Sequence, residues 1–261
     1  MFIKSLCTLS TFLSLALALR ISSKDDTERR LTRRPVRDQE PEGRKQFLDC
    51  YDRYGSQFHA VDYVPSLRVY NWDNKISSCC FTGIWMLYDA EDYNEYNTGA
   101  ATWWAHGVNN CLDVPSQFNS AASSLRFTGA PDDYMYDTLN LYFFDFFIGD
   151  EEFMYTDMPL LNYDDRARSV IVTGCSPWTL YQYDHYAGSA MCVFPSSSTD
   201  CTPGYYTSSQ SLGSLAGQVS SARKGCLAEE KVYPVNYGIK MEGNGTSGFF
   251  SENIRFLEDS I

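Results

Sequence analysis

The sequence lacks the short motifs that mark the common enzyme active sites. It has no GxSxG nucleophile elbow, no HExxH helix, no glycine-rich phosphate loop and no HxE…PCxxC arrangement. Histidine is scarce, with 3 in 261 residues: His59, His106 and His185. These absences leave no candidate catalytic residue, so we expect a protein that is not an enzyme.

The body of the chain also lacks long apolar runs and helical apolar stripes. A stretch of mostly Leu, Ala, Ser and Thr from Leu6 to Leu19 follows Lys4, but it is shorter than the roughly 18 residues that a membrane-spanning helix needs. It is typical of a cleaved signal peptide. The alternative is a buried helix, which the charge-dense segment 22–45 disfavours. We therefore expect a secreted, extracellular protein with no membrane span.

Zinc-binding patterns are absent too, because the sequence has no CxxC pair and no two neighbouring histidines. Of the 9 cysteines, Cys7 falls in the expected signal peptide, which leaves an even number for a disulfide framework. Cys79 and Cys80 would point to opposite faces of a strand, so each needs a distant partner. Half of the framework precedes residue 130, which predicts two bridges on each side but leaves their connectivity open. The candidates are Cys50, Cys79, Cys80, Cys111, Cys175, Cys192, Cys201 and Cys226.

Positive charge is scarce after residue 46. Residues 1–46 carry 10 Lys and Arg against 6 Asp and Glu, which leaves the remainder with a net charge near −16. Such a charge repels phosphate backbones, so we expect no nucleic-acid partner, while soluble cations and basic surfaces remain possible partners. Simple solubility explains the acidity equally well. Residues 19–46 read as a charged disordered leader or a propeptide, with the basic run 29–34 as a candidate processing site.

A repeat organises the chain after residue 46. An aromatic residue, four residues, a second aromatic, one residue and a glycine recur at Tyr142–Gly149 and Tyr181–Gly188. A third copy, Tyr88–Glu95, has glutamate in place of the glycine, and Tyr51–Gly55 is a shortened fourth. Serines precede a strand-like run downstream of each copy, at 77–81, 123–127, 169–172 and 220–223. A period near 46 residues indicates stacked supersecondary units.

Each unit is rich in Tyr, Phe, Val and Thr and is punctuated by turn residues, which predicts short strands. The glycine would take a positive φ in a tight, folded-over hairpin that the two aromatic rings cover. The later serine would hydrogen-bond this hairpin and hold it on the sheet. This pattern resembles the Greek-key motif of the βγ-crystallin family. The resemblance implies an all-β fold with two Greek-key sandwich domains.

The resemblance also implies the domain boundaries, because successive motifs pair into one domain. Residues 1–18 would be the signal peptide, 19–46 the leader, 47–129 domain 1, 134–232 domain 2 and 233–261 a C-terminal extension. The extension contains the sequon Asn244-Gly245-Thr246, a glycosylation site in a secreted protein if it is exposed.

Asp73–Ser78 resembles the calcium signature of the family, in which two motifs exchange ligands across a domain. By resemblance, Asp73 and Asn74 form the leading pair, Asn74 ligates with its side chain, Lys75 ligates with its carbonyl, and Ser77 reaches the partner motif's ion. Short oxygen-bearing side chains on a compact loop suit calcium. The alternative is an Asx-turn with tethering serines.

The partner copy begins at Asn119 and keeps Ser123, but it has lost the second acidic or amide residue. The resemblance therefore implies one strong and one weak calcium site in domain 1. Domain 2 would bind none, because Arg168 stands where a hydroxyl ligand belongs and the last copy has lost both leading ligands.

We therefore expect a secreted, calcium-binding structural protein, associated with extracellular matrix or a mineral layer. The alternative is a secreted binding or defence module: a protease inhibitor, a toxin component or a lectin. Inhibition would use the loop Pro195–Cys201. A glycan-binding lectin would require Trp103 and Trp104 to be exposed.

Overall fold

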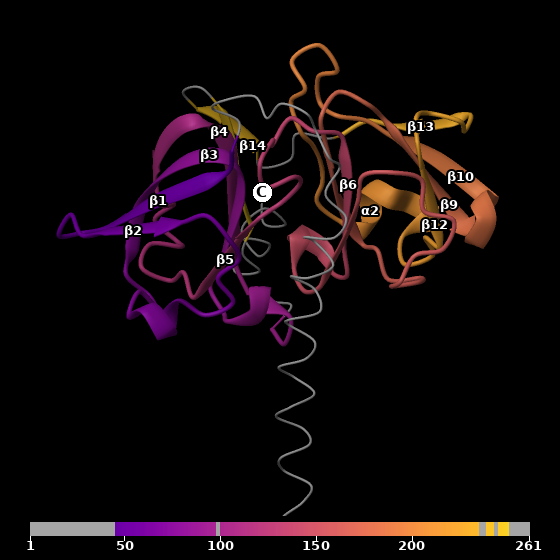
Figure 1. Ribbon diagram of the computed structural model, residues 1–261. Helices are drawn as coiled ribbons and strands as arrows, with labels where there is room; N and C mark the ends of the chain where they lie inside the picture. Colours follow the sequence, from indigo (N-terminus) through magenta and orange to yellow (C-terminus); the bar gives the residue numbers. More distant parts are fainter. Residues whose placement is uncertain (1–44, 98–99, 235–238, 243–244, 251–261) are drawn as a thin grey trace, which may run out of the picture. The chain divides into compact units, whose positions relative to one another are not determined.

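The computed structural model describes residues 45–97, 100–234, 239–242 and 245–250 (Figure 1). All of them belong to one unit of the chain. The expected signal peptide, nearly all of the leader and Asn244 lie outside the described residues. Gln46 is an exception: it was expected to end the leader, but its side chain is buried and donates to the carbonyl oxygens of Thr128 and Ala130.

Domain 1 is built on one bent sheet. Its strands are β1 (Phe47–Asp52), β2 (Gln57–Ala60), β3 (Ile76–Tyr88), β4 (Thr102–Asp113) and β5 (Ser124–Phe127). The pairing register of β3 and β4 shifts between Phe81 and Gly83. Cys79 and Phe81 before the shift and Trp85 and Leu87 after it all join one core. The two halves of the long strands therefore enclose the core as the two layers of a sandwich would.

Domain 2 has two separate four-stranded sheets, in the orders β11-β8-β6-β7 and β12-β9-β10-β13. The first contains β6 (Thr138–Tyr142), β7 (Glu151–Met154), β8 (Ser169–Thr173) and β11 (Gly204–Tyr206). The second contains β9 (Trp178–Tyr183), β10 (Ala187–Val193), β12 (Ser221–Lys224) and β13 (Glu230–Val232). Alternating residues such as Leu139 and Val170 from one sheet and Leu180 and Met191 from the other form the second core.

The aromatic corners are short 3-10 turns with left-handed residues, at η2 (Asp92–Asn94), η3 (Asp145–Phe147) and η4 (Asp184–Tyr186). The remaining short helical turns are η1 (Leu67–Tyr70), α2 (Ser209–Leu212) and η5 (Gly213–Leu215). Gly149 has φ 77°, and a Cβ there would lie 2.7 Å from the Phe144 ring, so glycine is required. Where Glu95 replaces the glycine, the preceding Asn94 takes φ 62°, whereas the equivalent Ile148 of a glycine corner has φ −86°.

Buried serines fasten three of the four corners, whereas the sequence predicted a serine tether in each of them. The Ser169 hydroxyl donates to the Phe144 carbonyl oxygen over 2.6 Å and accepts from the Phe147 N–H over 3.0 Å. Ser124 and Ser221 make the same two bonds in their own corners. In the shortened first corner, the Asp52 carboxylate accepts from the N–H groups of the turn instead.

The four disulfides connect Cys50 with Cys79, Cys80 with Cys111, Cys175 with Cys201 and Cys192 with Cys226. This confirms two bridges on each side of residue 130 and separate partners for Cys79 and Cys80. Both of these partners stand directly opposite in the strand register, on β1 and β4 respectively. Four disulfides indicate an oxidising or extracellular environment.

A C-terminal hairpin extends the sheet of domain 1, which the sequence did not reveal. It comprises β14 (Ile239–Glu242) and β15 (Gly245–Phe250), and β15 pairs antiparallel with the first half of β4. Phe249 packs against the core of domain 1, and Phe250 stacks on Phe146 with ring centroids 3.4 Å apart. The strand therefore contacts residues of both domains.

Candidate metal site

The two predicted calcium loops of domain 1 lie against each other. The Asn74 N–H donates to the Ala122 carbonyl oxygen over 2.9 Å, and the Ser120 N–H donates to the Ile76 carbonyl oxygen over 3.1 Å. Asn74 and Ser120 occupy the same position in their loops, and both have φ 58°. The loops thus exchange equivalent backbone bonds, as two copies of one motif would.

This exchange brings together two predicted site residues that are 50 positions apart. The Ser123 hydroxyl donates to Asp73 Oδ1 over 2.7 Å. The Asp73 side chain is 20% exposed and Ser123 is buried. A carboxylate from the first loop and a hydroxyl from the second therefore form one group that solvent can reach.

The other predicted residues lie on the same two loops. The Lys75 ammonium donates to the Asn71 carbonyl oxygen over 2.6 Å and so lies along the outside of the first loop. Ser77 is the second residue of β3, and its carbonyl oxygen accepts from the Val114 N–H. Asn119 accepts a long 3.4 Å hydrogen bond from its neighbour Ser120. Ser77 and Asn119 belong to the half of the arrangement where the weaker site was expected.

Sequence reasoning missed two charged residues at the edge of this group, Arg68 beside Asp73 and Glu91 beside Arg68. The Arg68 guanidinium lies 3.6 Å from Asp73 Oδ2 and 3.3 Å from a carboxylate oxygen of Glu91. Glu91 also accepts from the Ser66 hydroxyl over 2.8 Å. These residues come from η1 and from the corner that contains η2, outside both copies of the signature. Their charge is the only signal in the sequence, and it says nothing about position.

The donors fit a hard cation such as calcium. Asp73, Asn74 and Ser123 supply carboxylate, amide and hydroxyl oxygens, and calcium favours such a mixture together with loop carbonyls. A guanidinium already lies next to the Asp73 carboxylate, so the position accommodates positive charge. Among the described residues, no cluster of three or more His, Cys, Asp and Glu side chains is suitably placed for a metal. Any metal here would thus depend on amide, hydroxyl and backbone oxygens as well.

The equivalent loops of domain 2 make the same pair of backbone hydrogen bonds, but their side chains offer poorer ligands for calcium. The Asp165 N–H donates to Val219, and the Gly217 N–H donates to Ala167. The Ser220 hydroxyl lies 3.4 Å from Asp165 and makes a shorter 2.8 Å bond to the Gln182 carbonyl oxygen. This pair of loops is the natural internal comparison for domain 1.

The side chains proposed for sugar stacking are inside the protein. Trp103 and Trp104 are 1% and 2% exposed, so the lectin hypothesis, which required them on the surface, is wrong. His106 lies beside them with a ring nitrogen 3.0 Å from the Tyr205 hydroxyl, and burial lowers the pKa of His106 to about 4. The sequence TWWAH is therefore part of the apolar packing.

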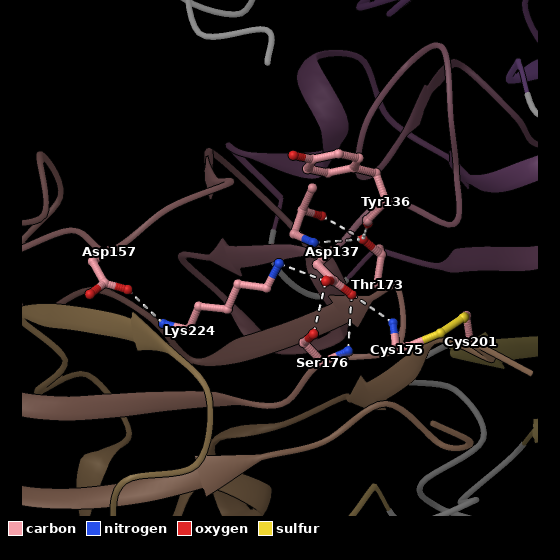
Figure 2. Close-up of polar contacts among 9 residues, drawn as sticks. Tyr136, Asp137, Asp157, Thr173, Cys175, Ser176, Cys201 and Lys224 are labelled. Atoms are coloured by element: carbon pink, nitrogen blue, oxygen red, sulfur yellow. Dashed lines mark hydrogen bonds and ion pairs between the residues drawn. A yellow bond between two sulfur atoms is a disulfide. The ribbon is translucent and has the colours of Figure 1, made fainter. Parts of the chain in front are cut away.

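A second polar cluster centres on Asp137, where three segments of domain 2 meet (Figure 2). Its carboxylate accepts from the N–H groups of Cys175 and Ser176, from the Ser176 hydroxyl and from the Lys224 ammonium, the last over 2.6 Å. Burial alone would raise the pKa of Asp137, but these four donors outweigh it and hold the pKa below its ordinary value. The cluster joins the residue just before β6 to the connection between β8 and β9 and to the end of β12.

Comparison with solved structures finds a likeness that extends over most of this chain. Geodin, a βγ-crystallin from Geodia cydonium, matches at 18% identity with a TM-score of 0.55, covering 69% of this chain and 99% of geodin. A βγ-crystallin from an archaeon matches at 26% identity with a TM-score of 0.29, covering 34% of this chain and 96% of its own. One from Ciona intestinalis matches at 21% identity with a TM-score of 0.28, covering 33% and 98%.

No protein-family model and no curated protein matches the sequence. At 18% identity the likeness to geodin establishes the fold. The protein therefore has a βγ-crystallin-like fold of two Greek-key domains, as the corner pattern predicted, and it is braced by disulfides, as the number of cysteines predicted. Within the described ranges, no helix has the length and apolar character needed to cross a bilayer.

Proposed function

We propose that the protein is a secreted, non-catalytic structural protein whose domain 1 binds calcium. The observation that carries the proposal is the hydrogen bond from Ser123 to Asp73, which gathers oxygen donors from two loops at one point. Asp73, Asn74, the Lys75 carbonyl and Ser123 would hold the stronger ion. Ser77 and Asn119 would belong to the weaker one, because Ser120 takes the place of an acidic or amide ligand there.

Calcium bound in this way has a structural role. It adds a link between two loops whose present contact is a few hydrogen bonds, and it binds the native state in preference to the unfolded chain. Such a ligand raises the free energy of unfolding by mass action. The acidity of the body and the cation together support a place in an extracellular matrix or a mineral-associated layer.

The test is differential scanning calorimetry of the chelated protein with and without added calcium. We expect the melting temperature to rise with calcium, by roughly the few degrees that 1–2 kcal/mol produces in a domain of this size. Ser123→Ala should remove most of the rise. Ser220→Ala, which removes the equivalent hydroxyl of domain 2, should leave it intact. No rise in the wild-type protein would overturn the proposal.

A second candidate function, protein binding in defence, has one observation in its favour. Ser196, Ser198, Thr199 and Asp200 are exposed on a single loop. The loop is braced internally, since the Asp200 carboxylate accepts from the Ser197 hydroxyl over 3.0 Å, and Cys201 anchors its end to Cys175. A rigid exposed loop is what a protease inhibitor presents. Undiminished activity across a panel of proteases at excess protein would dismiss this candidate.

A further inference from the structure

Arg68 lies between two carboxylates at the edge of the candidate site. Its terminal nitrogen is 3.6 Å from Asp73 Oδ2, and its Nε is 3.3 Å from Glu91 Oε1. The other Asp73 oxygen accepts from Ser123. One oxygen of Asp73 is thus engaged by the second loop and the other faces a cation that the chain itself supplies.

We propose that Arg68 is a built-in competitor for the metal and that Glu91 is a second carboxylate of the site. The inference rests on the proposed calcium function and deepens it. A guanidinium and a calcium ion bind the same carboxylate oxygens, so the two compete for Asp73 and Glu91. Neither residue belongs to the sequence signature. Arg68 therefore raises the calcium concentration at which the site fills.

The exposure of the three side chains makes this competition feasible. The Arg68 side chain is 72% exposed, whereas those of Asp73 and Glu91 are 20% and 41% exposed. Exposed ion pairs contribute little free energy, so a divalent ion can displace the arginine at small cost. The carboxylates are held more firmly, because Ser123 and Ser66 donate to them. The arginine can leave while the acidic pair stays in place.

The test measures calcium affinity by competition with a fluorescent chelator in the full-length protein. Arg68→Gln should bind calcium roughly three- to tenfold more tightly, since it removes a positive charge next to the ligands. Glu91→Gln should bind more weakly by a similar factor. The control is Arg223→Gln, because Arg223 forms an exposed pair with Asp157 in domain 2 at 3.1 Å. Its affinity should match that of the wild type.

Each outcome separates this inference from the proposed function. Equal affinities for Arg68→Gln, Arg223→Gln and the wild-type protein would overturn the inference and leave calcium binding standing. If the Arg68→Gln variant bound calcium and the wild-type protein did not, Arg68 would exclude calcium completely, which is the strongest form of the inference. Absence of binding in every variant would overturn both. Melting temperatures in chelator check folding, and all three surface substitutions should stay within a few degrees of the wild type.

Discussion

Arg126 donates a hydrogen bond of 2.8 Å to the carbonyl oxygen of Phe147 and thereby connects β5 of domain 1 to a corner of domain 2. The arginine is 1% exposed. Its guanidinium carbon lies 4.6 Å from the ring centroid of Tyr93 and 4.9 Å from that of Tyr142. The Tyr88 hydroxyl accepts from Arg126 and donates to the same carbonyl oxygen. A buried cation among tyrosine rings thus holds the two domains together.

Replacing Arg126 with methionine should lower the free energy of unfolding by about 3–5 kcal/mol, because the change leaves buried hydrogen-bonding partners unmatched. Arg223 provides the control. It lies at the equivalent position of the last motif, 4.6 Å from the Tyr186 ring centroid, but it is partly exposed. Arg223→Met should cost less than about 1 kcal/mol. Urea denaturation measures both, and equal losses would contradict the assigned role of Arg126.

Ser169→Ala should destabilise domain 2 by about 1–3 kcal/mol, since it leaves a buried carbonyl oxygen and a buried N–H without their partner. The exposed Ser198 is the control, and Ser198→Ala should change stability by less than about 0.5 kcal/mol. Thermal unfolding followed by circular dichroism would show the difference. If both variants melted with the wild type, the serine would not fasten the corner.

Asp137 should make the protein sensitive to acid. Its pKa is lowered in the folded state, so its contribution to stability is complete above the ordinary aspartate pKa of about 3.9 and is lost as the pH falls through the lower folded value. Asp137→Asn should therefore melt below the wild type at neutral pH, and the gap should narrow as the pH falls below about 4. A gap that stayed constant with pH would contradict this. The exposed Asp164→Asn serves as the control.

Gly248→Val should detach β15 from β4. A Cβ at this position would lie 2.3 Å from the Trp104 ring, which is closer than packed atoms can approach. Backbone N–H groups of residues 102–106, which pair with β15, should then exchange with solvent faster. Hydrogen exchange read by mass spectrometry detects this. Unchanged protection over these residues would mean that β15 contributes little to the edge of the sheet.

The corners were predictable because their chemistry is local. Tyr142, Phe147 and Gly149 lie within eight residues of one another, and the φ of 77° at Gly149 is the kind of constraint that a sequence records. The serine tethers join residues farther apart, such as Ser169 and Phe144, and were predictable because a serine recurs in each repeat. Glu95 shows the limit, because the preceding Asn94 takes the positive φ in that corner and its residue type alone did not predict this.

The long-range features were not predictable, since a single sequence does not show which distant residues lie together in the fold. Nothing in Gly248 or Phe250 indicates that the C-terminal hairpin pairs with β4, more than 100 residues earlier. Arg126 reads as one more strand residue, and for Trp103 and Trp104 core packing is the more frequent explanation, although residue type alone leaves a surface position open. Arg68 became part of the candidate site through the path of the chain, which brings η1 next to the first loop.

The most direct test of the central claim is a calcium titration followed residue by residue in a ¹⁵N-labelled protein. The account predicts that amide resonances of residues 73–77 and 119–123 shift first and together, because the two loops share the ion. Those of the equivalent loops, 164–168 and 216–220, should stay in place. Absence of shifts, or shifts confined to domain 2, would contradict a calcium site between the two predicted calcium loops of domain 1.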